Sequence, residues 1–314
     1  MKHRALILCV HFQRHLDRYR ERLERQGVEI EAPPVVQRMT KRELLPLIGG
    51  FDAVLAGDDE ITADVLQAAG RLKVIVKWGI GVDAIDLDCA RRLGIPVVST
   101  PGAFADEVAD VVIGYLILLA RKLHLLDREV RQGRWIKPEG RSLRDRRLGV
   151  IGVGSIGRAL VERARVLGME VMGHDVEPVP EELVARTGLR MVDLPEILAT
   201  SDFLSLNCPL TAKTHHLLDA AAFSRMKYGI QLINTGRGPL IDESALVTAL
   251  REGKVAGAAL DVFEQEPLPE DSPLRAFDNC IFGTHNASNT LDAVLRTNER
   301  ALDALLRGLE VARA

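Results

Sequence analysis

Short apolar runs alternate with amphipathic stretches over the first hundred residues of the chain. Runs rich in β-branched side chains and bounded by turn residues predict strands, whereas apolar positions spaced three and four apart predict helices. Helices are expected between the strands, for example at 16–25 and 63–69. The expected strands are 5–9, 28–31, 53–56, 73–76 and 96–99. This alternation indicates a parallel sheet with helices on both of its faces.

A second alternation of strands and helices begins at residue 148. Its expected strands are 148–152, 170–174, 203–206, 231–233, 257–260 and 280–282. Six strands with helices between them fit the size of a dinucleotide-binding domain. The last helical stretch, 291–311, is expected to return to the first domain, with hinges near 100–101 and 285–290.

Residues 106–134, between the two alternations, are predicted to form one long helix. Its middle, VVIGYLILLA, is apolar on nearly every side, so we expect this helix to be buried on all sides. Packing between two domains would bury part of it, and a subunit interface would bury more. We favour both together over domain packing alone.

Composition narrows the class of partner. The chain has 314 residues, enough for two domains, and its 47% hydrophobic and 27% charged residues are typical of a soluble globular protein. The net charge is −3 and no basic block stands out, which argues against nucleic acid as the main partner. The four cysteines are far apart and form no C-x-x-C pair, so we expect reduced thiols and no metal site.

The sequence contains two notable apolar stretches, and neither predicts a transmembrane segment or a signal peptide. The amino-terminal sequence MKHRALILCVHFQRH has an apolar run of only six residues, too short for the core of a signal peptide. The longest apolar stretch, 111–120, ends at Arg121 and Lys122 and is too short to cross a bilayer. We therefore expect a cytoplasmic protein with no membrane partner.

The sequence GVIGVGSIGRAL places Gly152, Gly154 and Gly157 as G-x-G-x-x-G between an apolar run and an amphipathic helix. The pattern alone is weak, but this setting is the one that a dinucleotide site needs. The first glycine makes a tight turn, the second lets pyrophosphate approach the backbone, and the third allows close packing of helix on strand. Free N–H groups at the amino end of the helix would bind the phosphates.

Asp175 stands eighteen residues after Gly157, at the end of the next predicted strand. An acidic residue there accepts hydrogen bonds from the adenosine ribose hydroxyls and repels a 2′-phosphate. No arginine follows it closely, so the sequence favours NAD over NADP as the cofactor. The structural alternative is an aspartate in an ordinary turn after a strand.

The residues after the later strands would meet at one edge of the second sheet, where open parallel sheets bind their ligands. They include Arg237, Asp261, Glu266 and His285. Histidine can take and return the proton of an alcohol, and a carboxylate at its other nitrogen fixes the tautomer. Arginine can hold a substrate carboxylate by two parallel hydrogen bonds. The set suits reversible hydride transfer at an alcohol carbon.

Each of these residues also has a structural interpretation. Arg237 would suit a surface salt bridge, Glu266 a turn and Asp261 a helix cap, while a single histidine is more often structural than catalytic. Their occurrence together at successive strand ends favours the functional interpretation.

With these residues in place, the sequence resembles the NAD-dependent D-isomer-specific 2-hydroxyacid dehydrogenases. The likeness covers nearly the whole chain, and His285 with Ser288 falls where the family has its histidine. Four blocks carry it: KWGIGVDAID (77–86), GVIGVGSIGRA with Asp175, LINTGRGPLID (232–242) and AALDVFEQEP (258–267).

The resemblance implies a role for each matching residue. Arg237 would bind the substrate carboxylate and carbonyl, His285 would be the acid–base group, and Glu266 would pair with it. Backbone N–H groups near Ile80 and Gly81 would hold the substrate carboxylate. The implied NAD-binding residues are Gly152, Gly154, Ser155, Ile156, Gly157, Asp175, Cys208, Pro209, Thr214, Thr235 and Asp261, the last of them at the nicotinamide carboxamide.

The resemblance also implies an α/β fold with two Rossmann-like doubly wound parallel-sheet domains separated by a cleft. Residues 1–100 with 287–314 would form a flavodoxin-like substrate domain, and residues 101–286 the NAD-binding domain. The partner would be a small-molecule substrate, and the assembly a homodimer.

Two positions depart from the family pattern, because Thr284 replaces the usual proline before the histidine and Asn286 the usual isoleucine after it. Two alternatives to an active dehydrogenase stay open, and the two departures bear on the second of them. One is an NAD(H)-sensing interaction protein of the corepressor type on the same fold. The other is a protein that binds NAD but has lost activity.

The substrate is the least determined part of the prediction. The first-domain blocks look most like members of the phosphoglycerate dehydrogenase-like or hydroxypyruvate/glyoxylate reductase-like branch. Lys77, or Arg134 from a partner subunit, would then lie near a substrate phosphate. The alternative for Lys77 is a solvated lysine at the end of a strand.

Overall fold

The computed structural model describes residues 3–311 and contains two parallel sheets. The chain divides into two compact units, one made of Met1–Ala103 with Asn289–Ala314 and the other of Phe104–Ser288. The predicted α/β class with two parallel sheets is confirmed. Within the described residues, no helix is both long enough and apolar enough to span a membrane.

The first unit is built on a five-stranded sheet in the order β2-β1-β3-β4-β5. This is the flavodoxin-like order of doubly wound sheets. All five strands were predicted, with the first and fourth displaced by one or two residues. The strands are β1 (His3–Ile7), β2 (Val28–Glu31), β3 (Ala53–Ala56), β4 (Val74–Lys77) and β5 (Val97–Ser99).

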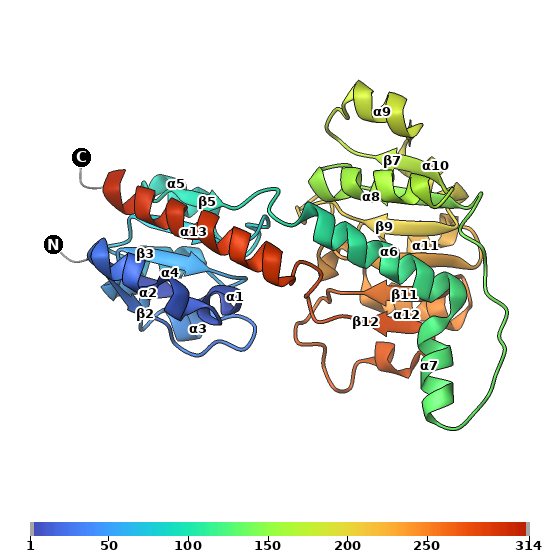
Figure 1. The fold of residues 1–314 in the computed structure, drawn as a ribbon, viewed down its shortest axis with the longest axis horizontal. Coiled ribbons are helices and arrows are strands. Elements are labelled where there is room, and N and C mark those ends of the chain that lie inside the picture. Colours follow the sequence, from blue (N-terminus) through green and yellow to red (C-terminus); the bar gives the residue numbers. More distant parts are fainter. Residues whose placement is uncertain (1–2, 312–314) are drawn as a thin grey trace. The chain divides into compact units, whose positions relative to one another are not determined.

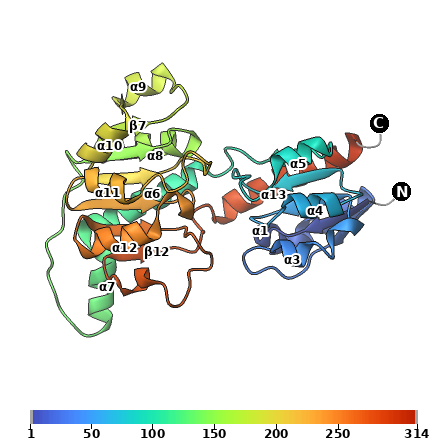
Figure 2. The ribbon, with the colours of Figure 1, turned by 180° about the vertical axis from the view of Figure 1, so that it is seen from behind.

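Helices cover both faces of this sheet (Figures 1 and 2). The faces separate because alternate strand residues point to opposite sides. Leu6, Val54 and Ile75 pack against α3 (Lys41–Leu44), α4 (Ala63–Ala68) and α5 (Leu87–Arg92). The final helix, α13 (Leu291–Val311), packs on β3 and β4 from the other face, as predicted for the last helical stretch. The remaining helices of this unit are α1 (Val10–Gln13), α2 (Leu16–Arg25) and the short 3-10 turn η1 (Ile48–Gly50).

The second unit contains a seven-stranded sheet in the order β12-β11-β10-β9-β6-β7-β8. Renumbered from its first strand, this is the Rossmann order with one further strand. The prediction of six strands was wrong by one, because the two-residue edge strand β8 is exposed and too short to show any apolar period. The strands are β6 (Arg147–Ile151), β7 (Glu170–His174), β8 (Arg190–Met191), β9 (Phe203–Leu206), β10 (Ile230–Asn234), β11 (Val255–Leu260) and β12 (Cys280–Phe282).

Two helix layers enclose this sheet. One buried cluster joins the strands to α6 (Ala105–Arg121) and α8 (Ser155–Val166), which lie together in front of the sheet in Figure 1. A second cluster joins the opposite face to three helices that are seen in Figure 2, namely α10 (Leu194–Thr200), α11 (Ala220–Arg225) and α12 (Glu243–Arg251). The other elements are α7 (Leu123–Arg131), α9 (Glu181–Thr187), η2 (Gly238–Leu240) and η3 (Pro273–Ala276).

The predicted single helix 106–134 is two helices, α6 and α7, separated at Lys122. Lys122 adopts a left-handed conformation with φ 54°, which ends one helix and turns the chain into the next. Within a single chain the helix is not buried on all sides, and its burial in a subunit interface stays a prediction. Six side chains of α6 are buried, but others such as Ile113 and Ile117 are partly exposed, and α7 has no buried residue.

In both sheets, an aspartate at the amino end of a central strand forms two hydrogen bonds to the backbone of an arginine on the neighbouring strand. Asp52 donates its N–H to the Arg4 carbonyl (2.8 Å), and its carboxylate accepts the Arg4 N–H (2.9 Å). Asp202 repeats this arrangement with Arg147, at 2.9 Å for both bonds. The two units thus share a structural repeat that their sequences do not reveal.

Replacing Asp202 by asparagine is expected to lower the free energy of unfolding at neutral pH by about 2 kcal/mol, because hydrogen bonds to a charged group are lost. Burial acts to raise the pKa of Asp202, but the Arg147 N–H and the Lys227 ammonium outweigh it, so this pKa lies below the ordinary 3.8. A lowered carboxyl pKa stabilises the fold above the unfolded-state value and ceases to do so as pH falls through the folded-state value. Denaturant unfolding should therefore show a difference between Asp202→Asn and the natural chain at pH 7 that narrows below about pH 3.8. An equal difference at both pH values would contradict the charge-based account.

Candidate active site

The candidate site lies at the carboxyl edge of the seven-stranded sheet. The strand order changes direction between β6 and β9, which are hydrogen-bonded neighbours. Ligands of doubly wound sheets bind outside such a switch point. The glycine loop follows β6, and the predicted polar residues follow β9, β10, β11 and β12.

The three glycines have three different surroundings, each matching its predicted use. Gly152 has φ +91°, and a Cβ there would lie 2.5 Å from the Cys208 nitrogen. A Cβ on Gly157 would lie 2.1 Å from the Gly152 oxygen, so this glycine lets α8 pack onto the loop. A Cβ on Gly154 would meet nothing within 4 Å, so this position faces open space where a ligand can approach the backbone. Ser155 and Ile156 form the first turn of α8, with Ser155 exposed.

Replacing Gly157 by alanine is expected to lower the stability of the fold, whereas replacing Gly154 by alanine is expected to weaken NADH binding. The Gly157→Ala side chain would push α8 away from the backbone at Gly152. Such overpacking costs about 1–3 kcal/mol, so the melting temperature should fall by several degrees. Gly154→Ala should leave the melting temperature nearly unchanged and weaken NADH binding at least tenfold, as about 1.4 kcal/mol lost at the pyrophosphate would do. Thermal unfolding and NADH fluorescence titration on both variants decide this, and normal NADH affinity in Gly154→Ala would contradict it.

Asp175 lies beside this loop, immediately after β7. Its carboxylate accepts the N–H of Val153 (2.6 Å) and that of Glu177 (2.9 Å). Burial raises the pKa of the neighbouring Cys208 thiol to about 11, and the negative charge of Asp175 adds to that rise. The ends of β6, β7 and β9 therefore meet around the amino end of α8.

Pro209 and Thr214 belong to a turn after β9. The Thr214 hydroxyl donates to the Pro209 carbonyl (2.7 Å) and accepts the Thr211 N–H (2.8 Å). The Thr214 side chain therefore shapes the turn itself.

Arg237 is presented by a turn after β10 that the buried Asn234 holds. The Asn234 side chain accepts the Gly236 N–H (3.0 Å) and donates to the Arg237 carbonyl (2.9 Å). Asn234 was not predicted as a functional residue, and its only sequence signal is an amide at the end of a buried strand. Thr235, in the same turn, has a buried hydroxyl oxygen without a hydrogen-bond partner among the described residues, which suits contact with a ligand.

His285 and Glu266, nineteen residues apart, are brought into contact by the ends of β12 and β11. The distance between His285 Nδ1 and Glu266 Oε2 is 2.8 Å, and the side chains are 23% and 19% exposed. The other Glu266 oxygen accepts the Phe263 N–H (3.0 Å), so the carboxylate is itself held in place. A carboxylate at Nδ1 favours the tautomer protonated there, which makes Nε2 the nitrogen that exchanges a proton.

Asp261, at the end of β11, is buried and faces the loop that carries His285. Its carboxylate accepts the N–H groups of Asn286 (3.1 Å) and Ala287 (2.9 Å). The residue that was predicted to meet the nicotinamide thus also binds the histidine loop.

A second histidine–carboxylate pair links neighbouring loops and was missed in the sequence. His216 Nε2 lies 2.8 Å from Glu264 Oε1, and Glu243 accepts the Glu264 N–H (2.8 Å). Burial raises the pKa of Glu243, and the charges of Glu264 and Glu266 raise it further. No spacing rule in the sequence connects these residues, because the contact depends on three separate strand ends.

In the first unit, Ile80 and Gly81 follow β4 in a loop whose Gly79 N–H donates to the Thr100 hydroxyl (2.8 Å). Lys77, the last residue of β4, is not the solvated lysine of one interpretation, because its side chain is only 4% exposed. Its ammonium donates to Asp58 (3.1 Å) and to the Trp78 carbonyl (2.8 Å). The charge of Lys77 is therefore balanced within the unit.

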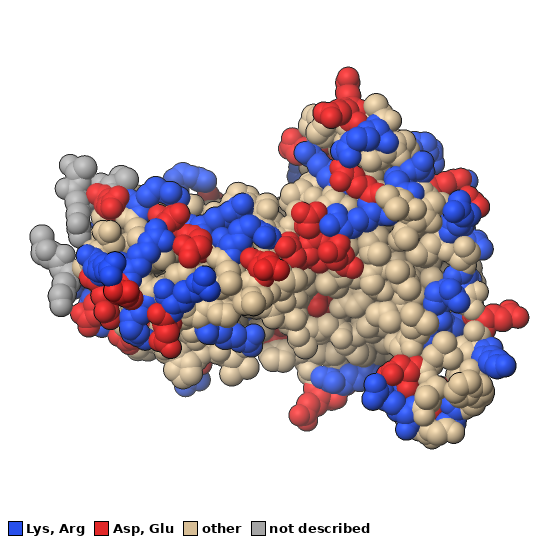
Figure 3. Space-filling model, viewed as in Figure 1, with Lys and Arg blue, Asp and Glu red and all other residues tan. Residues whose placement is uncertain are grey.

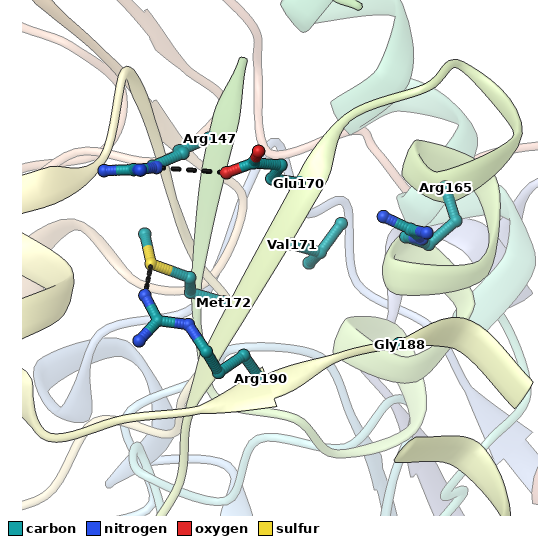
Figure 4. A pocket seen from close by; sticks show the side chains of 7 residues that line it. All are labelled: Arg147, Arg165, Glu170, Val171, Met172, Gly188 and Arg190. Atoms are coloured by element: carbon teal, nitrogen blue, oxygen red, sulfur yellow. Dashed lines mark hydrogen bonds and ion pairs between the residues drawn. The ribbon is translucent and has the colours of Figure 1, made fainter. Parts of the chain in front are cut away.

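A pocket of about 310 Å³ lies elsewhere, beside the amino ends of β6 and β7 (Figure 4). Its arginines point in different directions: Arg147 pairs with Glu170 (3.1 Å), and Arg190 contacts the Met172 sulfur (3.1 Å). It lies at the edge opposite to the glycine loop and contains none of the predicted site residues.

Comparison with known proteins agrees with this picture. Residues 113–287 match the family model described as "D-isomer specific 2-hydroxyacid dehydrogenase, NAD binding domain". The chain is 39% identical over 279 residues to a glyoxylate reductase of Thermofilum pendens, with 86% of this chain and 82% of that protein covered. It is 34% identical over 307 residues to a hydroxypyruvate reductase of Thermotoga maritima, with 96% and 98% covered.

Two further matches extend the comparison. A D-3-phosphoglycerate dehydrogenase of Methanocaldococcus jannaschii is 39% identical over 269 residues, which cover 84% of this chain but only 51% of that protein. The crystal structure of a D-lactate dehydrogenase from Aquifex aeolicus, complexed with NAD and lactic acid, superimposes with a TM-score of 0.88 at 28% identity, covering 98% and 95% of the two chains.

Proposed function

This chain belongs to the D-isomer-specific 2-hydroxyacid dehydrogenase family, and we propose that it reduces small 2-keto acids with NADH through Arg237, Glu266 and His285. It is an NAD-dependent oxidoreductase that takes a small-molecule substrate. The observation that carries the residue assignment is the 2.8 Å contact between His285 Nδ1 and Glu266, whose other oxygen is fixed by the Phe263 N–H.

The proposed chemistry assigns one task to each side chain. Bound NADH supplies the hydride that is added to the keto carbon. His285 donates the proton at Nε2 to the carbonyl oxygen, and Glu266 stabilises the imidazolium before that transfer. Arg237 binds the substrate carboxylate and polarises the carbonyl. In the oxidation direction, His285 takes the hydroxyl proton back.

The nucleotide assignment rests on the surroundings of the glycine loop. Gly154 leaves open space at the amino end of α8, and the buried Thr235 hydroxyl suits a ligand contact. We assign the pyrophosphate to Gly154, Ser155 and Ile156, and the adenosine ribose to Asp175. Cys208, Pro209 and Thr214 are assigned to the adenine side, with backbone contacts from the turn that Thr214 shapes.

Replacing Asp175 by serine is expected to change the choice of cofactor. The negative charge that repels a 2′-phosphate is removed, so the ratio of kcat/KM for NADH to that for NADPH should fall by about tenfold or more, the effect of about 1.4 kcal/mol. Initial rates with both cofactors measure this ratio. Asp193→Ser, which removes an aspartate that caps α10 in the same unit, is the control, and an equal change in it would contradict the assignment.

For the substrate, we propose unphosphorylated 2-keto acids, glyoxylate or hydroxypyruvate, in preference to phosphohydroxypyruvate. The support is Lys77, whose ammonium is paired with Asp58 and buried. A substrate phosphate would have to compete with the Asp58 carboxylate, and like charges in a partly buried site repel. Arg134, the other phosphate candidate, forms hydrogen bonds to Glu129.

Steady-state oxidation of NADH with glyoxylate, hydroxypyruvate, phosphohydroxypyruvate and pyruvate tests the proposal. We expect turnover with at least one of the first two and a lower kcat/KM for the phosphorylated compound. Binding of NADH without reduction of any of the four compounds would overturn the proposed function. A preference for phosphohydroxypyruvate would overturn only the substrate assignment.

We also propose that residues 1–100 with 287–314 bind the substrate and residues 101–286 bind NAD, and that the protein is a cytoplasmic homodimer. Support for the dimer comes from the unit that contains α6. Beyond the charged amino-terminal turns of α6, Figure 3 shows a broad surface of this unit without charged side chains. The apolar residues Ile113, Ile117 and Leu118 of α6 are partly exposed. Trp135, after α7, is 80% exposed. The four cysteines are free thiols, as a reducing compartment requires.

A further inference from the structure

The backbone of His285 is held in an uncommon conformation. Its φ is 54°, in the left-handed region that non-glycine residues seldom occupy. Such conformations cost free energy and persist where surrounding contacts determine them. Three backbone hydrogen bonds that hold this part of the loop go to one residue, Asp261.

Asp261 accepts three consecutive backbone N–H groups. The His285 N–H donates to its carbonyl (2.6 Å), and those of Asn286 and Ala287 donate to the two carboxylate oxygens (3.1 and 2.9 Å). Successive N–H groups that converge on an anion form a nest, and a left-handed residue is part of that geometry. The carboxylate is thus matched to the same backbone conformation that turns the imidazole toward Glu266.

The other side of this carboxylate is enclosed as well. A Cβ on Gly283 would lie 2.0 Å from Asp261 Oδ1 and 2.7 Å from the Tyr115 hydroxyl. Burial raises the pKa of Tyr115, and the charge of Asp261 raises it further, so Tyr115 stays a neutral neighbour. The Asp261 side chain is buried and has little room to move, which makes it a rigid support for the loop.

We propose that Asp261 is a positioning residue for His285: its carboxylate fixes the left-handed turn that places the imidazole against Glu266. This inference rests on the proposed function, because the group being positioned is the proposed acid–base group. It differs from a contact with the nicotinamide, since its consequence is the orientation of a protein side chain. A misplacement of about 1 Å at a reacting group costs about a hundredfold in rate.

Three variants test this proposal. Asp261→Asn replaces one acceptor oxygen by a donor, so one of the two loop N–H bonds is lost. Gly283→Ala keeps the carboxylate but displaces it. Asp202→Asn is the matched control, since it alters a buried aspartate that accepts a backbone N–H at the opposite edge of the same sheet.

Five measurements on each variant separate positioning from other roles: kcat, the affinity for NADH, the affinity for ADP-ribose, hydrogen exchange of the segment 281–290, and NMR of isotope-labelled histidine. For Asp261→Asn and Gly283→Ala we expect kcat to fall by about a hundredfold. The ring nitrogen signals of His285 should change and exchange in 281–290 should accelerate, with the affinity for ADP-ribose unchanged. Asp202→Asn should keep the natural kcat and the natural His285 signals, and any faster exchange that follows from its lower stability should not be confined to 281–290.

Two results would overturn the proposal. One is an Asp261→Asn protein with natural kcat and natural His285 signals. The other is a loss of NADH affinity without a loss of ADP-ribose affinity and without change in the His285 signals, which would assign Asp261 to the nicotinamide alone. If the natural protein reduces no 2-keto acid, the proposed function fails, whereas the NMR and exchange results still decide whether Asp261 positions His285.

Discussion

Replacing His285 by alanine is expected to lower kcat for reduction of a 2-keto acid by about a hundredfold to ten-thousandfold, the usual contribution of a positioned acid–base group. The affinity for NADH should stay unchanged, because the nucleotide assignment involves the glycine loop and Asp175 instead. Stopped-flow reduction rates and NADH fluorescence titration measure the two quantities separately.

The chain provides a matched control for this variant. His216 also has a positive φ, 50°, and lies 2.8 Å from a carboxylate, that of Glu264. His216→Ala removes the same chemical group from the same kind of pair, and its kcat should stay close to the natural value. Equal losses in both variants, or a loss of NADH affinity that parallels the loss of rate in His285→Ala, would contradict the proposed role of His285.

Replacing Arg237 is expected to have the second-largest effect. A guanidinium forms two parallel hydrogen bonds to a carboxylate, each worth about 1.5–3 kcal/mol when the groups are charged. Arg237→Ala should therefore lower kcat/KM for the keto acid by about a hundredfold or more. Arg237→Lys should recover only part of this loss, since an ammonium cannot make the paired contact.

Added guanidinium ion should raise the activity of Arg237→Ala but not that of Arg237→Lys. Arg275→Lys is the control, because the Arg275 guanidinium in the same unit donates to the backbone carbonyls of Leu268 and Pro269. A loss in kcat/KM for Arg237→Ala that is matched by a loss of NADH affinity would assign Arg237 to the cofactor and contradict the substrate role.

Much of the fold was predictable because its strands are short and bounded by turn residues. β2, β3, β7, β9 and β12 have the predicted bounds, since their apolar runs begin and end at turn residues. The break at Lys122 was not predictable, because an apolar run continues up to it and a lysine gives no signal for a left-handed conformation. β8 was missed because its pairing with β7, not its own sequence, makes it a strand.

The sequence was enough to predict which residues lie at the carboxyl ends of the strands, but not the hydrogen bonds that hold these residues in place. Listing the residues after each strand was enough to predict that Glu266 and His285 meet, because parallel strands end at one edge. The hydrogen bonds that position the loops carrying these residues were missed. Neither Asn234 under Arg237 nor Asp261 under His285 is implied by spacing, since their hydrogen bonds are to backbone groups whose direction the sequence does not give. The burial of Lys77 depends likewise on Asp58, from the loop after a different strand.

The most direct measurement of the central claim is transfer of deuterium from NADH labelled at C4 of the nicotinamide to C2 of the 2-hydroxyacid product, with glyoxylate and hydroxypyruvate as substrates. We predict labelled product from the natural protein, D-configured in the case of hydroxypyruvate, and almost none from His285→Ala at the same NADH occupancy. Saturating NADH binding without label in any product, or equal labelling by the natural protein and the variant, would contradict the account.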